Sequence, residues 1–413
     1  MTPRERVLAA VNHREADRVP IDQGSMRSSG IMAIAYNRLK QHLGISEGAT
    51  YVYDLIQQLA LPEQWFLDRF HVDAVDLGRA AIDPRDGRPW RLPDGSAAVA
   101  PAWFQPKRVD GELFVHDKQG RPIGKMPAGG YYIDQTVWPL SGPDGLDNFE
   151  PLAEKMDQVI WAAIPAAPWE EELTDARIEE IGRLARHLYE TTDYAIALSV
   201  GCNLFEWSQM LFGMENFYLY LGSEKRKLGR FLDRLAEHHM EFLRRVLPAV
   251  KGYVQLLVVG DDLGMQSGPQ LSPAMYRELF LPRHKKIYEL AKRLSGAHLF
   301  MHNCGGLYQL IPSLIEAGVE ILNPVQTSAR HMEPERLKRE FGADITFWGG
   351  GCDTQQTLIH GTPEQVRDDV RRRLEVWMHG GGYVFNQVHN VLSDVPPENT
   401  VAMLDAAYEF GRY

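Results

Sequence analysis

The chain has 413 residues, 44% of them hydrophobic and 24% charged, which is typical of a soluble globular protein with a large core. Its formal net charge of −11 argues against a nonspecific hold on nucleic acid. The sequence shows neither a leader-like opening nor an apolar run that could cross a bilayer, so we expect a cytoplasmic protein without a membrane span.

The N-terminal third predicts a helix, two strands and an inserted β-rich segment. "TPRERVLAAVNH" predicts a short helix with Thr2 as its cap and Pro3 at its first position. "DRVPIDQG" and "DAVDLG" (73–78) are typical of strands. Between residues 79 and 145, turn pairs separate short alternating runs, which predicts a β-meander or lid. We expect this insertion to belong to a single domain that spans residues 1–413.

After residue 170, strands and helices alternate strictly. The strands are short apolar runs, as expected where both faces of a sheet are covered. The predicted strands are 194–201, 253–260, 297–303, 319–325, 344–350 and 382–388, and the helices between them include 174–190, 307–317, 333–341, one capped by Ser272, one from Thr362 to about His379 and one from Pro397. This order predicts a parallel α/β fold. We favour a (β/α)8 TIM barrel over a doubly wound sheet, because no G-x-G-x-x-G follows a first strand.

All three cysteines follow predicted strands, at the end where barrels place their chemistry. In "MHNCGG", His302 and Cys304 are two residues apart, so both side chains can point to the same side. Cys352 follows a neighbouring strand in "GGGCD". One imidazole and two thiolates can supply three corners of a zinc tetrahedron. A buried histidine beside inert cysteines is the alternative.

A fourth protein ligand is expected from the loop after strand 194–201. Glu206 is favoured because the first turn of a helix would aim it over the barrel mouth; Cys202 and Glu215 are the alternatives. Without a fourth ligand, substrate takes the position.

Four further residues are candidates for catalysis. Asp261 and Asp262 could act as general acid and base, and the alternative is that one of them binds backbone amides. Arg27 could clamp a carboxylate, with a surface ion pair as the alternative. His389 ends the last predicted strand segment.

Three stretches resemble the uroporphyrinogen decarboxylase superfamily, whose fold is a (β/α)8 barrel: "TPRERVLAAVNHREADRVPID", "LSPAMYRELFLPRHKKIYEL" and "FNQVHNVLSDVPPENTVAML". "MRSSGI" keeps Arg27 but has Ile31 where the decarboxylases have a second arginine, and "DAVDLGRA" lacks their later aspartate. The superfamily's cobalamin-dependent methyltransferases bind zinc through H-x-C…C, which His302, Cys304 and Cys352 match position by position.

The resemblance therefore implies a zinc-dependent methyltransferase that moves a methyl group between a small molecule and the cobalt of a corrinoid. No D-x-H-x-x-G stretch is present, so the corrinoid (cobalamin) would come from a partner carrier protein. Aromatic residues of the insertion, with Trp207, favour O-demethylation of a methoxylated aromatic or demethylation of a methylamine-type donor. The alternatives are transfer from the corrinoid to a thiol, a decarboxylase-like reaction, or a non-catalytic binding protein on the same fold. His389 matches a decarboxylase histidine, so a structural role is the alternative to catalysis for this residue. The sequence leaves the oligomeric state open.

Overall fold

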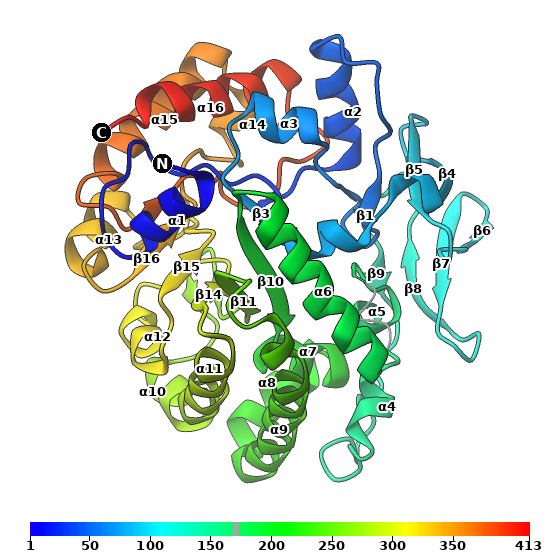
Figure 1. Cartoon of the computed structure of the whole chain (residues 1–413). Coiled ribbons are helices and arrows are strands. Elements are labelled where there is room, and N and C mark those ends of the chain that lie inside the picture. Colours follow the sequence, from blue (N-terminus) through cyan, green and yellow to red (C-terminus); the bar gives the residue numbers. More distant parts are fainter. Residues whose placement is uncertain (168–172) are drawn as a thin grey trace.

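The computed structural model describes residues 1–167 and 173–413, and its centre is a curled parallel sheet surrounded by helices (Figure 1). The order of its seven strands is β17-β16-β15-β14-β11-β10-β3. Their bounds are β3 Ala74–Asp76, β10 Ala195–Gly201, β11 Leu256–Gly260, β14 His298–His302, β15 Ile321–Asn323, β16 Thr346–Trp348 and β17 Tyr383–Val384. The predicted barrel-type α/β fold is confirmed.

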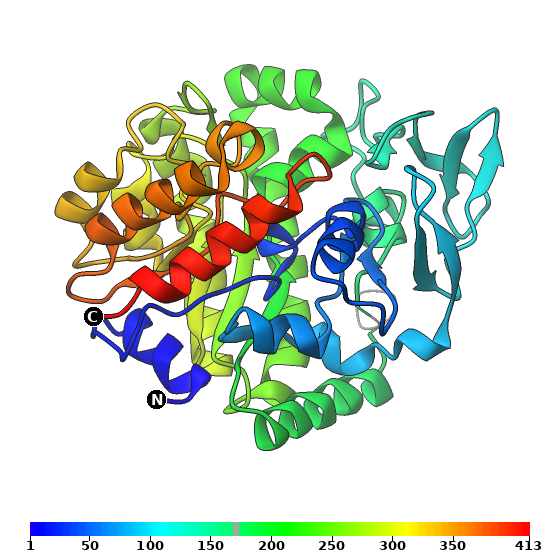
Figure 2. The same cartoon turned by 90° about the horizontal axis from the view of Figure 1, so that it is seen from above.

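The helices cover the outside of the sheet and connect its strands (Figures 1 and 2). Their bounds are α1 Pro3–Val11, α2 Ala33–His42, α3 Gln64–Arg69, α4 Leu152–Met156, α5 Ile160–Ala163, α6 Asp175–Thr191, α7 Phe205–Phe212, α8 Met214–Ser223, α9 Lys225–Val250, α10 Pro273–Met275, α11 Leu281–Ser295, α12 Ile311–Ala317, α13 Pro334–Phe341, α14 Thr357–His360, α15 Pro363–Trp377 and α16 Pro397–Phe410. The predicted caps Thr2, Ser272 and Thr362 each accept a hydrogen bond from a first-turn amide. None of the helices in the described ranges combines the length and apolar character that crossing a membrane requires.

Residues 18–22 close the sheet between its two edge strands. Ile21 forms a parallel bridge with Phe385, and its carbonyl accepts the Asp73 amide at 2.8 Å. The buried Asp73 carboxylate accepts the Ile21 amide at 2.8 Å in return. The contact is shorter than the predicted strand because Pro20 has no N–H to donate to a ladder.

The N-terminal end of the barrel is filled by apolar side chains. Alternate strand positions point inward and meet α1, as the two-residue period of a strand requires. The buried cluster consists of Val7, Ala10, Val11, Met26, Ala74, Ala195, Ala197, Leu256, Val258, Phe300, Ile321, Trp348 and Val384. The polar ends of β14, β15 and β17 therefore lie at the opposite, C-terminal end, where a site can form.

The expected β-rich insertion forms antiparallel strands beside the barrel (cyan in Figures 1 and 2). Its strands are β4 Gly87–Arg91, β5 Ala97–Pro101, β6 Lys107–Val109, β7 Glu112–His116, β8 Pro122–Met126 and β9 Asp134–Gln135. Two short pairs lie elsewhere: β1 Val52–Asp54 with β2 Leu59–Ala60, and β12 Gly264–Met265 with β13 Gly268–Pro269. Trp90 and Leu113 of the insertion are buried in the same hydrophobic cluster as the barrel helices.

Candidate metal centre

Three side chains meet at the C-terminal end of the barrel. His302 is the last residue of β14, Cys304 follows two residues later, and His389 lies in the loop after β17. One donor atom from each lies within 4.8 Å of the other two. The Cys304 Sγ is 3.4 Å from His302 Nε2, and the two imidazole rings are 5.5 Å apart between centroids. This group of three is called the His/Cys/His cluster below.

A hydrogen bond from the neighbouring strand fixes the orientation of His302. Asn323 pairs with His302 across β14 and β15, and its Nδ2 donates to the Trp348 carbonyl at 2.9 Å. Its Oδ1 is therefore the atom that faces His302 Nδ1, at 2.7 Å. Because an amide oxygen only accepts, His302 Nδ1 is the donor of this hydrogen bond, and Nε2 is the ring nitrogen that faces Cys304. Metal-binding histidines are held by such partners.

Asp262 lies beside the cluster and helps to position it. Its Oδ1 accepts the Cys304 amide at 2.7 Å and lies 3.7 Å from His302 Nε2. Burial, with the charges of Asp262 and Glu206, raises the pKa of the Cys304 thiol well above its usual range. A bound cation would reverse this effect by stabilising the thiolate.

Glu206 is turned toward Asp262. Its Oε2 accepts from Asn203 Nδ2 and, at 3.1 Å, from the Asp262 amide. Burial and the neighbouring charges of Asp262 and Asp261 raise the pKa of Glu206 well above its usual range. The raised pKa favours the protonated form of the carboxyl group, and its Oε2 is occupied as an acceptor. Glu206 is not a member of the His/Cys/His cluster.

Asp261 binds backbone amides, which was the alternative left open for one of the two aspartates. Its carboxylate accepts the amides of Leu204, Phe205 and Glu206 at 2.8–3.2 Å, at the start of α7. His284 Nε2 lies 3.1 Å from the same carboxylate. Asp261 thus neutralises the positive end of the helix that carries Glu206.

The structure places Cys352 outside the cluster. Cys352 is fully buried, and burial together with the charge of Asp369 on α15 raises the pKa of its thiol. The loop is held there because the Gly351 amide donates to Asn386 at 2.9 Å and the Cys352 carbonyl accepts the Val388 amide at 3.2 Å. The sequence motif predicts Cys352 as a ligand beside His302 and Cys304, and this stays a prediction; the structure adds His389 to these two.

The other two alternatives for a fourth ligand lie elsewhere. Cys202 is buried with its thiol 3.6 Å from the Val200 carbonyl, and burial raises the pKa of the thiol. Glu215 is exposed in the first turn of α8.

Arg27 belongs to a second polar group, near the insertion. Its Nε is 3.5 Å from the Asp54 carboxylate, and its guanidinium lies 5.2 Å from the centre of the Trp161 ring. Asp54 accepts from Gln57, and Gln57 Oε1 accepts from Asn390 at 3.1 Å. Since Asn390 follows His389 in the chain, these contacts link Arg27 to the segment that carries His389.

The donor atoms of the cluster suit zinc. Sulfur and imidazole nitrogen are the ligands that Zn²⁺ prefers, and a site with three protein ligands leaves a position for substrate. Burial and the nearby His302 lower the pKa of His389 to about 4, so its ring is neutral and can offer a lone pair. With His302 oriented by Asn323, the arrangement fits a metal ion without further rearrangement of that histidine.

Comparison with known proteins decides the family. The family model described as "Uroporphyrinogen decarboxylase (URO-D)" matches residues 177–410. The chain belongs to the uroporphyrinogen decarboxylase family. Uroporphyrinogen decarboxylase from Pseudoalteromonas translucida is 30% identical over 193 residues, which cover 46% of this chain and 50% of that protein. The enzyme from Pseudomonas putida is 30% identical over 183 residues, 43% of this chain and 47% of its own length. The chain thus spans about half the length of these curated relatives.

A solved structure is similar over nearly the whole chain. It is described as "methyltransferase from Methanosarcina mazei" and covers 99% of both chains with a TM-score of 0.56. At 16% sequence identity, the likeness shows a shared fold.

The sequence did not predict two of the residues that lie beside His302 as its neighbours. His389 was predicted as a catalytic residue, with a structural role as its alternative, and lies among the potential metal donors. Asn323 ends a predicted strand, but its role depends on the β14–β15 register that sets it opposite His302. Pairing the strand-end residues of adjacent parallel strands could have found Asn323.

Proposed function

We propose that this member of the uroporphyrinogen decarboxylase family is a zinc-dependent methyltransferase. It moves a methyl group between a small-molecule donor and the cobalt of a corrinoid held by a separate carrier protein. The observation that carries the proposal is the convergence of His302 Nε2, Cys304 Sγ and a His389 nitrogen within 4.8 Å, with His302 already oriented by Asn323. The fold shared with the methyltransferase from Methanosarcina mazei is consistent with it.

The donor set favours demethylation of a donor over methylation of a thiol. Zinc would act there as a Lewis acid on the heteroatom that carries the methyl group. Two neutral imidazoles and one thiolate leave a net positive charge on a bound Zn²⁺, which suits a phenoxide or alkoxide leaving group. A second thiolate, as the sequence motif predicted with Cys352, would reduce that charge.

Residues around the cluster have separate tasks. Asn323 fixes the His302 ring, and Asp262 holds the Cys304 backbone through the amide at 2.7 Å. Glu206 lies next to Asp262, and burial with the charges of Asp262 and Asp261 raises its pKa, so it would provide a proton to a leaving oxygen. Asp261 fixes the start of the helix that carries Glu206.

Arg27 would act on the substrate side. Its guanidinium lies over Trp161 and beside Asp54, and so presents a flat cation next to an aromatic ring. An aromatic donor with a carboxylate would fit such a pair better than a cationic methylamine. We therefore propose a methoxylated aromatic acid as the donor class.

The test combines metal content with turnover. The chain purified without chelator should contain about one zinc ion, the content expected of one mononuclear site. Reduced cobalamin should be converted to methylcobalamin with a methoxylated benzoate, followed by absorbance, and His302→Ala should abolish both the metal and the conversion.

Two outcomes would contradict the proposal. One is a wild-type chain without metal, and the other is a conversion rate that His302→Ala leaves unchanged. Parallel reactions with methylcobalamin and a panel of thiols, and with uroporphyrinogen, identify thiol methylation or decarboxylation as the activity instead.

A further inference from the structure

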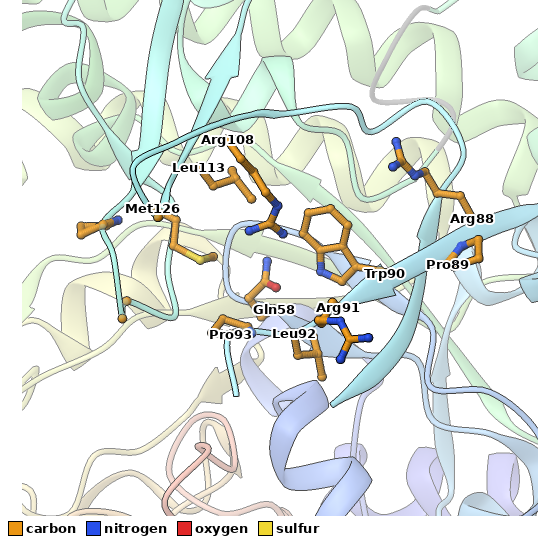
Figure 3. Close-up of a pocket in the computed structure, with 14 residues that line it drawn as sticks. Gln58, Arg88, Pro89, Trp90, Arg91, Leu92, Pro93, Arg108, Leu113 and Met126 are labelled. Carbon is orange, nitrogen blue, oxygen red and sulfur yellow. The ribbon is translucent and has the colours of Figure 1, made fainter. Parts of the chain in front are cut away.

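A cavity of about 480 Å³ lies in the β-rich insertion, away from the metal centre. Its walls come from β4, β6, β7 and β8, and its floor includes Gln58, which precedes β2 (Figure 3). The volume is in the range of cavities that bind small organic molecules. Neither the sequence motifs nor the proposed methyl transfer uses this cavity.

The cavity is lined by arginines and lacks compensating acids. Arg88, Arg91 and Arg108 line it, and none of the 14 residues that line it is acidic. Arg88 donates to the Phe104 carbonyl at 3.3 Å and Arg91 to the Gly95 carbonyl at 2.8 Å, so their described partners are neutral. In a chain with a net charge of −11, this gathering of guanidinium groups creates a local site for an anion.

Two buried polar atoms at the cavity have no partner among the described residues. The Trp90 side chain is 9% exposed and its Nε1 is unpaired, and Gln58 is 1% exposed with its Oε1 unpaired. Gln58 Nε2 already donates to the Leu55 carbonyl, so only its acceptor is left over. Unpaired buried groups are costly, and a ligand that pairs them recovers that free energy.

These groups face the same space. The Arg108 guanidinium lies 4.9 Å from the centre of the Trp90 ring. In Figure 3, Arg108, the Trp90 indole and the Gln58 amide are directed toward one another. Leu92, Leu113 and Met126 add apolar wall to the cavity.

We propose that this cavity is a binding site for a small organic anion that carries a carboxylate or phosphate group and a hydroxyl group. Arg108 would bind the anionic group, and the Trp90 N–H would donate to it. The Gln58 oxygen would accept the ligand's hydroxyl, and the apolar wall would cover its carbon skeleton. The site is independent of the metal centre and of the proposed methyl transfer.

Isothermal titration calorimetry of the full chain tests the proposal with three probes: 4-hydroxybenzoate, benzoate and inorganic phosphate. We expect 4-hydroxybenzoate to bind more tightly than benzoate, because only the former can donate to Gln58. Arg108→Gln should weaken 4-hydroxybenzoate about tenfold or more, the loss expected of one charge-assisted hydrogen bond. Arg91→Gln provides a second variant if Arg108→Gln does not fold.

Lys118→Gln is the matched control, since it removes an exposed cation of the insertion that does not line the cavity. It should leave all affinities unchanged. The proposal is overturned if the wild type binds neither aromatic acid, whether or not phosphate binds. It is also overturned if the folded arginine variants bind 4-hydroxybenzoate as tightly as Lys118→Gln does, which would place the acid elsewhere, for example at the proposed donor site.

Discussion

Zinc binding should depend on His389 and not on Cys352. Comparing variants that lack one or the other tests whether the ligands are those of the folded cluster or those of the sequence motif. His389 offers a neutral ring nitrogen within 4.8 Å of the donors of His302 and Cys304. Cys352 is not one of these three donors, and burial with the charge of Asp369 on α15 raises the pKa of its thiol. We expect His389→Ala to lose zinc and Cys352→Ala to retain it.

The magnitude follows from the number of ligands. Zinc sites with four protein ligands bind with about 10–16 kcal/mol, or about 2.5–4 kcal/mol per ligand. Loss of His389 should therefore raise the zinc Kd by about two to three orders of magnitude. Asn323→Ala leaves the ligands in place but frees the His302 ring, so the Kd should rise about 10- to 100-fold. Cys352→Ala should change it by less than about threefold, the uncertainty of such comparisons.

Competition with a chromophoric zinc chelator measures these constants, and circular dichroism verifies that each variant is folded. The reverse result, with zinc lost from Cys352→Ala and kept by His389→Ala, would refute the reasoning from the cluster. It would support Cys352 as the third ligand, as the sequence motif predicts.

Three other predictions test the supports of the site. Asp261→Ala leaves the amides at the start of α7 and His284 unpaired, so urea unfolding should show a loss of about 3–5 kcal/mol; a loss below about 1 kcal/mol would contradict the cap. Burial raises the pKa of Asp22 from 3.8 to about 6. The folded protein therefore holds this proton more tightly than the unfolded chain, which stabilises the fold at low pH. This contribution of about 3 kcal/mol is lost as the pH rises from about 4 through about 6. Asp22→Asn should remove that pH dependence relative to wild type, and identical curves would argue against it. Gly305→Ala places a Cβ 2.3 Å from the Gly264 carbonyl carbon. It should destabilise the protein more than Gly120→Ala, since Gly120 has a similar positive φ but open space around it. Equal melting temperatures of the two variants would count against this close packing.

The sequence predicted the fold because its periodicity and caps are local properties. Strand 194–201 and helix 174–190 appear as Ala195–Gly201 and Asp175–Thr191, within a residue of the predictions. The first predicted strand is reduced to a bridge at Ile21, since Pro20 cannot donate to a ladder.

The sequence by itself also determined that His302 and Cys304 lie together at a strand end, because two residues of strand or near-strand backbone bring side chains to one side. The tertiary structure determines which third residue joins them. The Gly351 and Cys352 backbone is hydrogen-bonded to the segment 386–388, and His389, whose backbone is left-handed with a φ of 66°, contributes its ring to the cluster. Spacing along the chain cannot encode this choice, since it depends on how two loops from separate strands pack against each other.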